Sequence, residues 1–224
     1  MKIGIIGGGS VGQTLGAALI AKRHEVVIGI RKTTPDELAK PRNFAATLAE
    51  WQTKTGGKVA TMAEAAAFAE VIINATNGEA SVAALNLAGA ANLNGKVLID
   101  VSNPLDFSKG MPPALLPAFA GHTSLGEQIQ AAFPQARVVK AFNTITAAVM
   151  LNPGLIPGDH DLFISGNDAA AKATVSELAR NFGWQYIVDL GDIIGARANE
   201  AILPVWVRLM MTGGPMFNIH VQRG

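Results

Sequence analysis

The stretch from Lys2 to Gly16 reads KIGIIGGGSVGQTLG, and it decides the fold that the rest of the sequence predicts. A short apolar run leads to Gly7, Gly9 and Gly12, spaced G-x-G-x-x-G, and a helical pattern follows. The first glycine permits a tight turn, the second lets a pyrophosphate approach the backbone, and the third lets the helix pack on the strand. A glycine-rich turn without function is the alternative. Because the required strand and helix are both present, we expect a dinucleotide site.

The composition excludes several classes of partner. The chain has 224 residues, of which 49% are hydrophobic, so it can bury a full core. Its net charge is +1 without a Lys/Arg cluster, and we expect neither nucleic acid nor a membrane surface as a partner. The uncharged stretch 141–158 contains prolines and glycines that would break a membrane helix. With no cysteine and no signal-peptide pattern, we expect a cytoplasmic protein.

Apolar runs alternate with helical patterns, which predicts an α/β fold of the Rossmann type: a doubly wound, mainly parallel sheet with a small C-terminal helical subdomain. Strands are expected within residues 2–6, 25–30, 58–60, 71–76, 96–104, 137–144, 161–166 and 184–190. One helix is expected over 35–53, with Pro41 as a candidate interruption, another over 195–211, and a surface loop over 105–124. We expect an NADP-binding domain at 1–145 and a smaller substrate and dimerisation subdomain at 146–224.

The end of the second strand bears on the choice of cofactor. NAD enzymes usually place Asp or Glu there, about twenty residues after the glycines, to bind the ribose hydroxyls. Here Arg31, Lys32, Thr33 and Thr34 follow the strand, and none of these four is a carboxylate. Two cations and two hydroxyls suit a 2′-phosphate, although they also suit an ordinary solvated turn. We therefore expect NADP.

Polar residues follow three further strands, where ligands of a parallel sheet bind. The clusters are Thr76-Asn77, Ser102-Asn103-Pro104 and Phe142-Asn143-Thr144. Amide and hydroxyl groups there can bind the nicotinamide ribose and carboxamide, while Pro104 and Phe142 can wall the ring. Asn, Ser and Pro are also ordinary turn residues, and this reading stays open.

Side chains for several other chemistries are absent from the sequence. The four histidines are isolated, so no metal site is expected, and Leu190 stands where a Tyr-x-x-x-Lys pair would need lysine after Tyr186. Lys140 is the candidate proton donor at a strand end. The favoured alternative is that its stem packs while its ammonium reaches solvent.

Several blocks along the whole chain resemble one family. IGIIGGGSVGQ, VVIGIRK, DVSNP, VVKAFNT, DLFISGNDAAAKATVSELARNFGW and GARANEAILPVWVRL are similar to the NADP oxidoreductases that depend on coenzyme F-420, a deazaflavin. The cytosolic NADPH domain of the STEAP metalloreductases has the same fold module. The resemblance implies NADPH binding and direct hydride exchange with a second cofactor. Family members commonly carry Ser or Asn where this chain has Ile30, which leaves strict NADP preference open.

The expected function is hydride transfer between NADPH and a deazaflavin or flavin-type acceptor, by a homodimer. A reductase of a small carbonyl or imine substrate and a non-catalytic NADP-binding regulator are the alternatives. No catalytic side chain is expected, because exchange between two rings needs orientation more than an acid or base. The expected cofactor-binding residues are Gly7, Gly9, Ser10, Val11, Gly12, Arg31, Lys32, Thr76, Asn77, Ser102, Asn103, Pro104, Ala141, Phe142 and Asn143.

Overall fold

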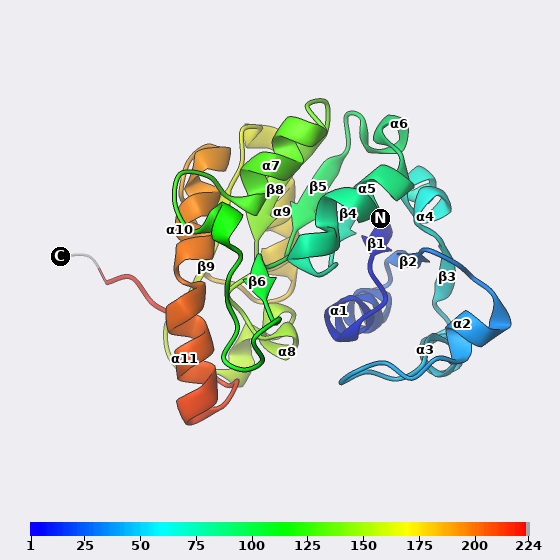
Figure 1. Cartoon of the computed structure of the whole chain (residues 1–224), viewed down its shortest axis with the longest axis horizontal. Helices are drawn as coiled ribbons and strands as arrows, with labels where there is room; N and C mark the ends of the chain where they lie inside the picture. Colours follow the sequence, from blue (N-terminus) through cyan, green and yellow to red (C-terminus); the bar gives the residue numbers. More distant parts are fainter. Residues whose placement is uncertain (223–224) are drawn as a thin grey trace.

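Eight strands form one sheet in a computed structural model that describes residues 1–222 (Figure 1). Residues 223 and 224, the last two of the predicted C-terminal subdomain, lie outside the described residues. The strands are β1 (Lys2–Ile6), β2 (Glu25–Ile30), β3 (Lys58–Thr61), β4 (Val71–Asn74), β5 (Val97–Asp100), β8 (Arg137–Ala141), β9 (Asp161–Ser165) and β10 (Tyr186–Asp189). Their order is β10-β9-β8-β5-β4-β1-β2-β3.

The sheet is mainly parallel, and the chain changes direction across it at β1. From β1 the chain adds β2 and β3 on one side, then returns to add β4, β5 and β8 on the other, all in parallel. β9 runs antiparallel to β8, and β10 is parallel to β9. The predicted fold class is confirmed, and the sheet continues beyond residue 145. The switch point between β1 and β4 is where such sheets bind ligands.

Helices cover both faces of this sheet, each with its own apolar core. The helices are α1 (Ser10–Ala21), α2 (Pro35–Ala39), α3 (Leu48–Thr55), α4 (Met62–Phe68), α5 (Ser81–Ala88), α6 (Ala90–Leu93), α7 (Leu125–Ala132), α8 (Ala147–Met150), α9 (Ala169–Asn181), α10 (Ala196–Ala201) and α11 (Leu203–Gly213). α1, α3, α8 and α9 pack on one core, through residues such as Leu19, Trp51 and Val175. α4 to α7 pack on the other, through residues such as Ala65, Leu85 and Ile129.

Both segments that were expected to be helical around a proline, 35–53 and 195–211, are divided into two helices in the structure. Lys40, before Pro41, adopts an extended conformation, so α2 ends at Ala39 and α3 begins only at Leu48. Pro204 lies in the first turn of α11, after a break from α10 at Ile202. The predicted loop 105–124 contains a small antiparallel hairpin, β6 (Leu105–Asp106) and β7 (Ala114–Leu115).

The C-terminal helices lie at the opposite end of the molecule from α2 and α3 (Figure 1). α11 packs on the β6–β7 hairpin, where Leu203 and Val207 contact Leu105. The tail then passes the start of β9, where the Ile219 carbonyl accepts a hydrogen bond from the Asp161 N–H. Among residues 1–222, no helix combines the length and the apolarity needed to cross a membrane.

Candidate functional site: the glycine turn and the strand ends

The three motif glycines have different surroundings in the structure. Gly7 has φ of +117°, a conformation that side chains disfavour, and a Cβ there would lie 2.6 Å from the Ala75 carbonyl oxygen. A Cβ on Gly12 would collide with the Gly7 carbonyl oxygen. A Cβ on Gly9 would meet nothing within 4 Å. The first and third glycines therefore shape the turn, whereas the second leaves open space above the start of α1.

The N-terminus of α1 is available to an anion. Its N-cap residue is Gly9, which provides no side-chain cap, and its first turn contains no acidic residue. By contrast, Thr47, Thr61 and Ser124 accept hydrogen bonds from the first turns of α3, α4 and α7. The free N–H groups and the helix dipole favour a phosphate at this point.

A cavity of about 420 Å³ opens beside this turn, and its lining fits a dinucleotide. Five of the residues predicted to bind the cofactor line it: Gly7, Gly9, Arg31, Thr76 and Asn77. Sequence reasoning missed the rest of the lining: Gly8, Ile30, Glu37, Arg42, Met62, Ala75, Ala80, Ala83, Ala84 and Leu87. Met62, Ala84 and Leu87 give the cavity an apolar wall suited to a base, while the glycine turn and the arginines suit phosphates.

Four other residues that were predicted to bind the cofactor do not line this cavity. Lys32 is exposed and does not line this cavity. Ser10 faces a groove between α1 and α3, and Val11 packs against the core. Phe142 has φ of 63°, and its ring is buried edge-on against Trp184, with ring centroids 6.4 Å apart. This ring packs in the core and does not line the cavity, and its expected place beside the nicotinamide stays a prediction.

Polar side chains at the ends of β4 and β5 form a buried hydrogen-bond network. Asn74 Nδ2 donates to Asp100 Oδ1 at 2.9 Å and to Ser81 Oγ at 3.1 Å. Ser102 Oγ donates to the same Asp100 oxygen at 2.6 Å. Thr76 Oγ1 donates to Asn74 Oδ1 at 2.7 Å, so the network reaches the cavity lining. These contacts fix the orientation of Thr76 and Ser102.

Lys140 extends this network as a fully buried cation. Its Nζ donates to Asp100 Oδ2 at 2.8 Å and to the Ser102 carbonyl at 2.6 Å, and lies 3.1 Å from Glu200 Oε1. Burial alone would lower the pKa of Lys140, but the carboxylates of Asp100 and Glu200 outweigh burial and raise it. The expectation that its ammonium reaches solvent is wrong, because both partners lie inside the protein.

Glu200 connects this network to the C-terminal helices. The carboxylate lies on α10 and accepts hydrogen bonds from the N–H groups of Leu125 at 2.8 Å and Gly126 at 3.1 Å, in the first turn of α7. The helix dipole there favours the negative charge. We call Asn74, Asp100, Ser102, Lys140 and Glu200 the strand-end cluster. It holds α10 against the carboxyl ends of β5 and β8.

Asparagine side chains also connect the loops after β5 and β8 to α10. Asn103 Nδ2 donates to the Asn143 carbonyl at 2.8 Å, and Asn143 Nδ2 donates to the Asn199 carbonyl on α10 at 2.9 Å. Asn103 Oδ1 is buried without a hydrogen-bond partner in the structure. A carboxamide donor would satisfy that oxygen. Pro104 and Ala141 are buried beside these loops.

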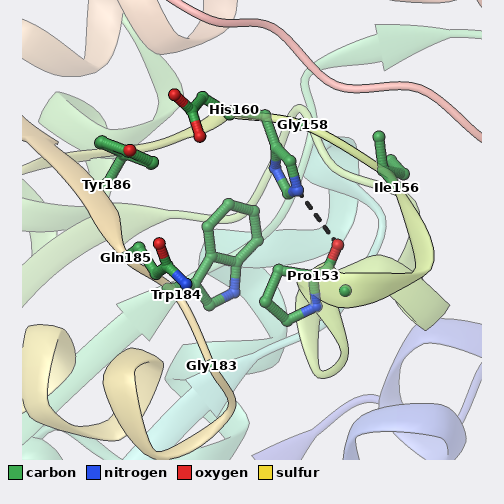
Figure 2. A pocket seen from close by; sticks show the side chains of 10 residues that line it. Pro153, Ile156, Gly158, His160, Gly183, Trp184, Gln185 and Tyr186 are labelled. Carbon is green, nitrogen blue, oxygen red and sulfur yellow. Dashed lines mark hydrogen bonds between the residues drawn. The ribbon is translucent and has the colours of Figure 1, made fainter.

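A second hollow, of about 250 Å³, lies at the far end of the sheet, beside the starts of β9 and β10 (Figure 2). His160 Nε2 donates to the Pro153 carbonyl at 3.0 Å, and its Nδ1 lies 2.9 Å from Asn218 Nδ2. Trp184 forms its inner wall, edge-on to His160. Both ring nitrogens of His160 are therefore paired. The residues predicted to bind the cofactor do not line this hollow.

Comparisons with known proteins identify the family of the chain. The family model described as NADP oxidoreductase, coenzyme F420-dependent, matches residues 2–104. An Arthrobacter sp. FB24 protein of known structure, assigned as an F420-dependent NADP reductase, is 48% identical, with a TM-score of 0.92 over 100% of both chains.

Two curated proteins are also similar to the chain over most of its length. The F420-dependent NADP reductase of Methanocaldococcus jannaschii is 29% identical over 93% of this chain and 92% of that protein. The metalloreductase STEAP3 of Rattus norvegicus is 32% identical over 92% of this chain, which spans only 38% of that protein's length. The similarity to the metalloreductase is therefore confined to a part of it.

Proposed function

The chain belongs to the coenzyme F420-dependent NADP oxidoreductases, and we propose that it transfers a hydride between NADPH and a deazaflavin or flavin-type acceptor. The family makes the chain an NADP-dependent oxidoreductase. The chemical class of the hydride acceptor is what we propose in addition to the family. In the forward direction NADPH gives up a hydride, and the acceptor takes that hydride together with a proton from water.

One observation carries the proposal: the ionisable side chains at the strand ends are buried and paired. Lys140 and Asp100 are 0% exposed and Glu200 is 1% exposed. Reduction of a carbonyl to an alcohol normally needs a positioned proton donor, and a buried Lys140 held by two carboxylates cannot approach a substrate. Hydride exchange between two ring systems needs orientation instead. The site therefore favours a ring acceptor over a small carbonyl or imine.

The chain's own residues would bind and orient NADPH. The N-terminus of α1 would bind the pyrophosphate beside Gly9, and Arg31 would contact the 2′-phosphate. Thr76, Asn77 and Ser102 would face the nicotinamide ribose, with Asn103 Oδ1 as an acceptor for the carboxamide. Ser102 owes its position to Asp100 and Lys140, which hold its hydroxyl and its carbonyl.

The same proposal includes a homodimer formed through α11. This helix buries Leu203 and Val207 but leaves Val205 56% exposed and Leu209 42% exposed, and Arg208 is its one charged residue. Val205 and Leu209 are four residues apart, so they share one helix face. A second copy of the same helix would cover this exposed apolar pair by two-fold symmetry.

Mixing the pure protein with NADPH and a panel of acceptors tests the proposed activity. Deazaflavin, flavins, small carbonyls and imines are added separately under anaerobic conditions, and the nicotinamide absorbance is followed. We expect rapid NADPH oxidation with the deazaflavin or a flavin. Turnover with a carbonyl or imine alone would favour the alternative reductase, and binding without turnover on any acceptor would favour a regulatory protein.

A further inference from the structure

Charged residues that are separate in sequence gather where β2 ends at the cavity. Arg31, Glu37 and Arg42 line the cavity together. Glu37 Oε2 lies 2.6 Å from Lys40 Nζ, and Glu37 Oε1 lies 3.5 Å from Arg42 Nη2. Three cations thus surround one carboxylate, and the region keeps a net positive charge.

Arg42 has donors to spare at this position. Its Nε is buried without a hydrogen-bond partner, and its Nη2 reaches the backbone carbonyl and the carboxylate Oε1 of Glu37 each at 3.5 Å, the outer limit of a hydrogen bond. A buried donor on a charged group costs free energy when it is left unpaired. The guanidinium fork matches the oxygens of a phosphate. The Nε of Arg42 therefore lacks an acceptor, and the cavity that Arg42 lines is where one could enter.

We propose that Arg42 is a specificity-determining residue, which with Arg31 clamps the 2′-phosphate of NADP and for which Glu37 is an internal competitor. This inference rests on the proposed function, because it concerns the same cofactor. Lys40 occupies one oxygen of Glu37 and Arg42 approaches the other. The Lys40 ammonium, with Arg42 and Arg31, lowers the pKa of Glu37, so this carboxylate stays ionised. Glu37 therefore positions the Arg42 guanidinium until a phosphate replaces the Glu37 carboxylate as its partner.

The arrangement explains how the chain can select NADP without a polar residue before Arg31. Ile30 is buried at that position and offers no hydrogen bond to a phosphate. Arg42 arrives instead from the segment after Pro41, which the extended conformation of Lys40 directs back toward the cavity. Because Glu37 competes with the phosphate for Arg42, the preference for NADP can change in either direction. Removal of the Arg42 guanidinium should lower this preference, and removal of the Glu37 carboxylate should raise it.

Calorimetry with two fragments that differ only in the 2′-phosphate tests this inference. Adenosine 2′,5′-bisphosphate and 5′-AMP are titrated into the whole protein, so the readout does not depend on hydride transfer. The wild type should prefer the bisphosphate. Arg42→Gln should lower this preference about tenfold or more, as for loss of a charged hydrogen bond, and Arg42→Lys should retain part of it.

Two further variants sharpen the test. Glu37→Gln should raise the preference, because it frees Arg42 for the phosphate. Arg23→Gln is the matched control: Arg23 is exposed between α1 and the start of β2, at the opposite end of β2 from Arg31, and its substitution should leave the preference unchanged while removing the same charge. Circular dichroism shows whether each variant is folded.

The outcomes separate this inference from the proposed function. If the wild type prefers the bisphosphate and Arg42→Gln keeps that preference, the Arg42 clamp is refuted while NADP binding stands. An equal loss of both fragments in Arg42→Gln would also refute it, because the effect would then be structural. If the wild type shows no preference, the NADP assignment of the proposed function fails together with the clamp.

Discussion

Lys140 Nζ lies 2.8 Å from Asp100 Oδ2, and neither side chain has any exposure to solvent. The ammonium group also donates to the Ser102 carbonyl at 2.6 Å. Since Glu200 joins from α10, the ion pair connects the sheet to the C-terminal helices. Buried ions are costly to hold, and their use here fixes the loops that would face the nicotinamide.

Lys140→Met should destabilise the protein by about 3–5 kcal/mol, because two buried carboxylates lose their shared counter-charge. Urea unfolding measures the change. Adding Asp100→Asn and Glu200→Gln in the same chain should recover part of the loss, since no unpaired charge then remains. Lys172→Met is the control: its partner Asp189 is half-exposed, and the expected loss is about 1 kcal/mol or less. Equal losses for the two lysines would contradict this role for Lys140.

Acid should weaken the contact between α7 and α10. Arg197 Nε and Nη2 donate to Glu127 at 2.8 and 2.6 Å, and these bonds lower the pKa of Glu127 below its ordinary value of 4.5. The pair therefore stabilises the fold above pH 4.5, and this contribution is lost as the pH falls through the lowered pKa. The free energy of unfolding of the wild type minus that of Glu127→Gln should be constant near neutral pH and shrink in acid. A difference independent of pH would refute the assignment.

Gly9→Val should abolish dinucleotide binding and leave the protein folded. Its Cβ meets no protein atom within 4 Å, so the side chain would occupy the space of the pyrophosphate. Gly12→Val is the matched contrast: it should impair folding itself, since its Cβ would collide with the Gly7 carbonyl. Circular dichroism and calorimetry with NADPH distinguish the two effects. Unchanged affinity in Gly9→Val would mean that the glycine turn has no role in binding.

The nucleotide-binding half of the fold was predictable because its signals are local. The glycine spacing and the apolar runs around it indicate β1, α1 and β2, and Gly7 and Gly12 each meet a steric demand that the motif encodes. The threonine before α4 forms the expected capping box with Glu64, whereas the capping box of Thr47 with Glu50, which begins α3, was not predicted. These features depend on neighbours in sequence.

The remaining features depend on contacts that no local pattern contains. Glu200 lies 60 residues beyond Lys140, and Arg42 reaches the cavity only because the chain leaves the helix at Pro41. Phe142 lies at a predicted strand end, yet its positive φ turns the ring into the core. The strands of the β6–β7 hairpin have two residues each, which is too few for the alternation of apolar and polar residues that indicates a strand in a sequence.

The protein should sediment as a dimer at micromolar concentration, and charge on α11 should separate the subunits. Val205→Glu combined with Leu209→Glu places two carboxylates on the exposed apolar face. These substitutions should leave the fold intact, because neither side chain is buried. Ala170→Glu, on the exposed surface of α9, is the control and should remain dimeric. A monomeric wild type would refute the homodimer.

The most direct test of the account follows a deuterium atom. NADPH labelled on one face of the reactive nicotinamide carbon, and then on the other, is mixed with the protein and oxidised deazaflavin in ordinary water. Direct transfer between the rings predicts deuterium in the reduced deazaflavin for one of the two labels. Deuterium released to water from both labels, or NADPH that stays reduced with every deazaflavin and flavin, would contradict hydride transfer to a ring acceptor.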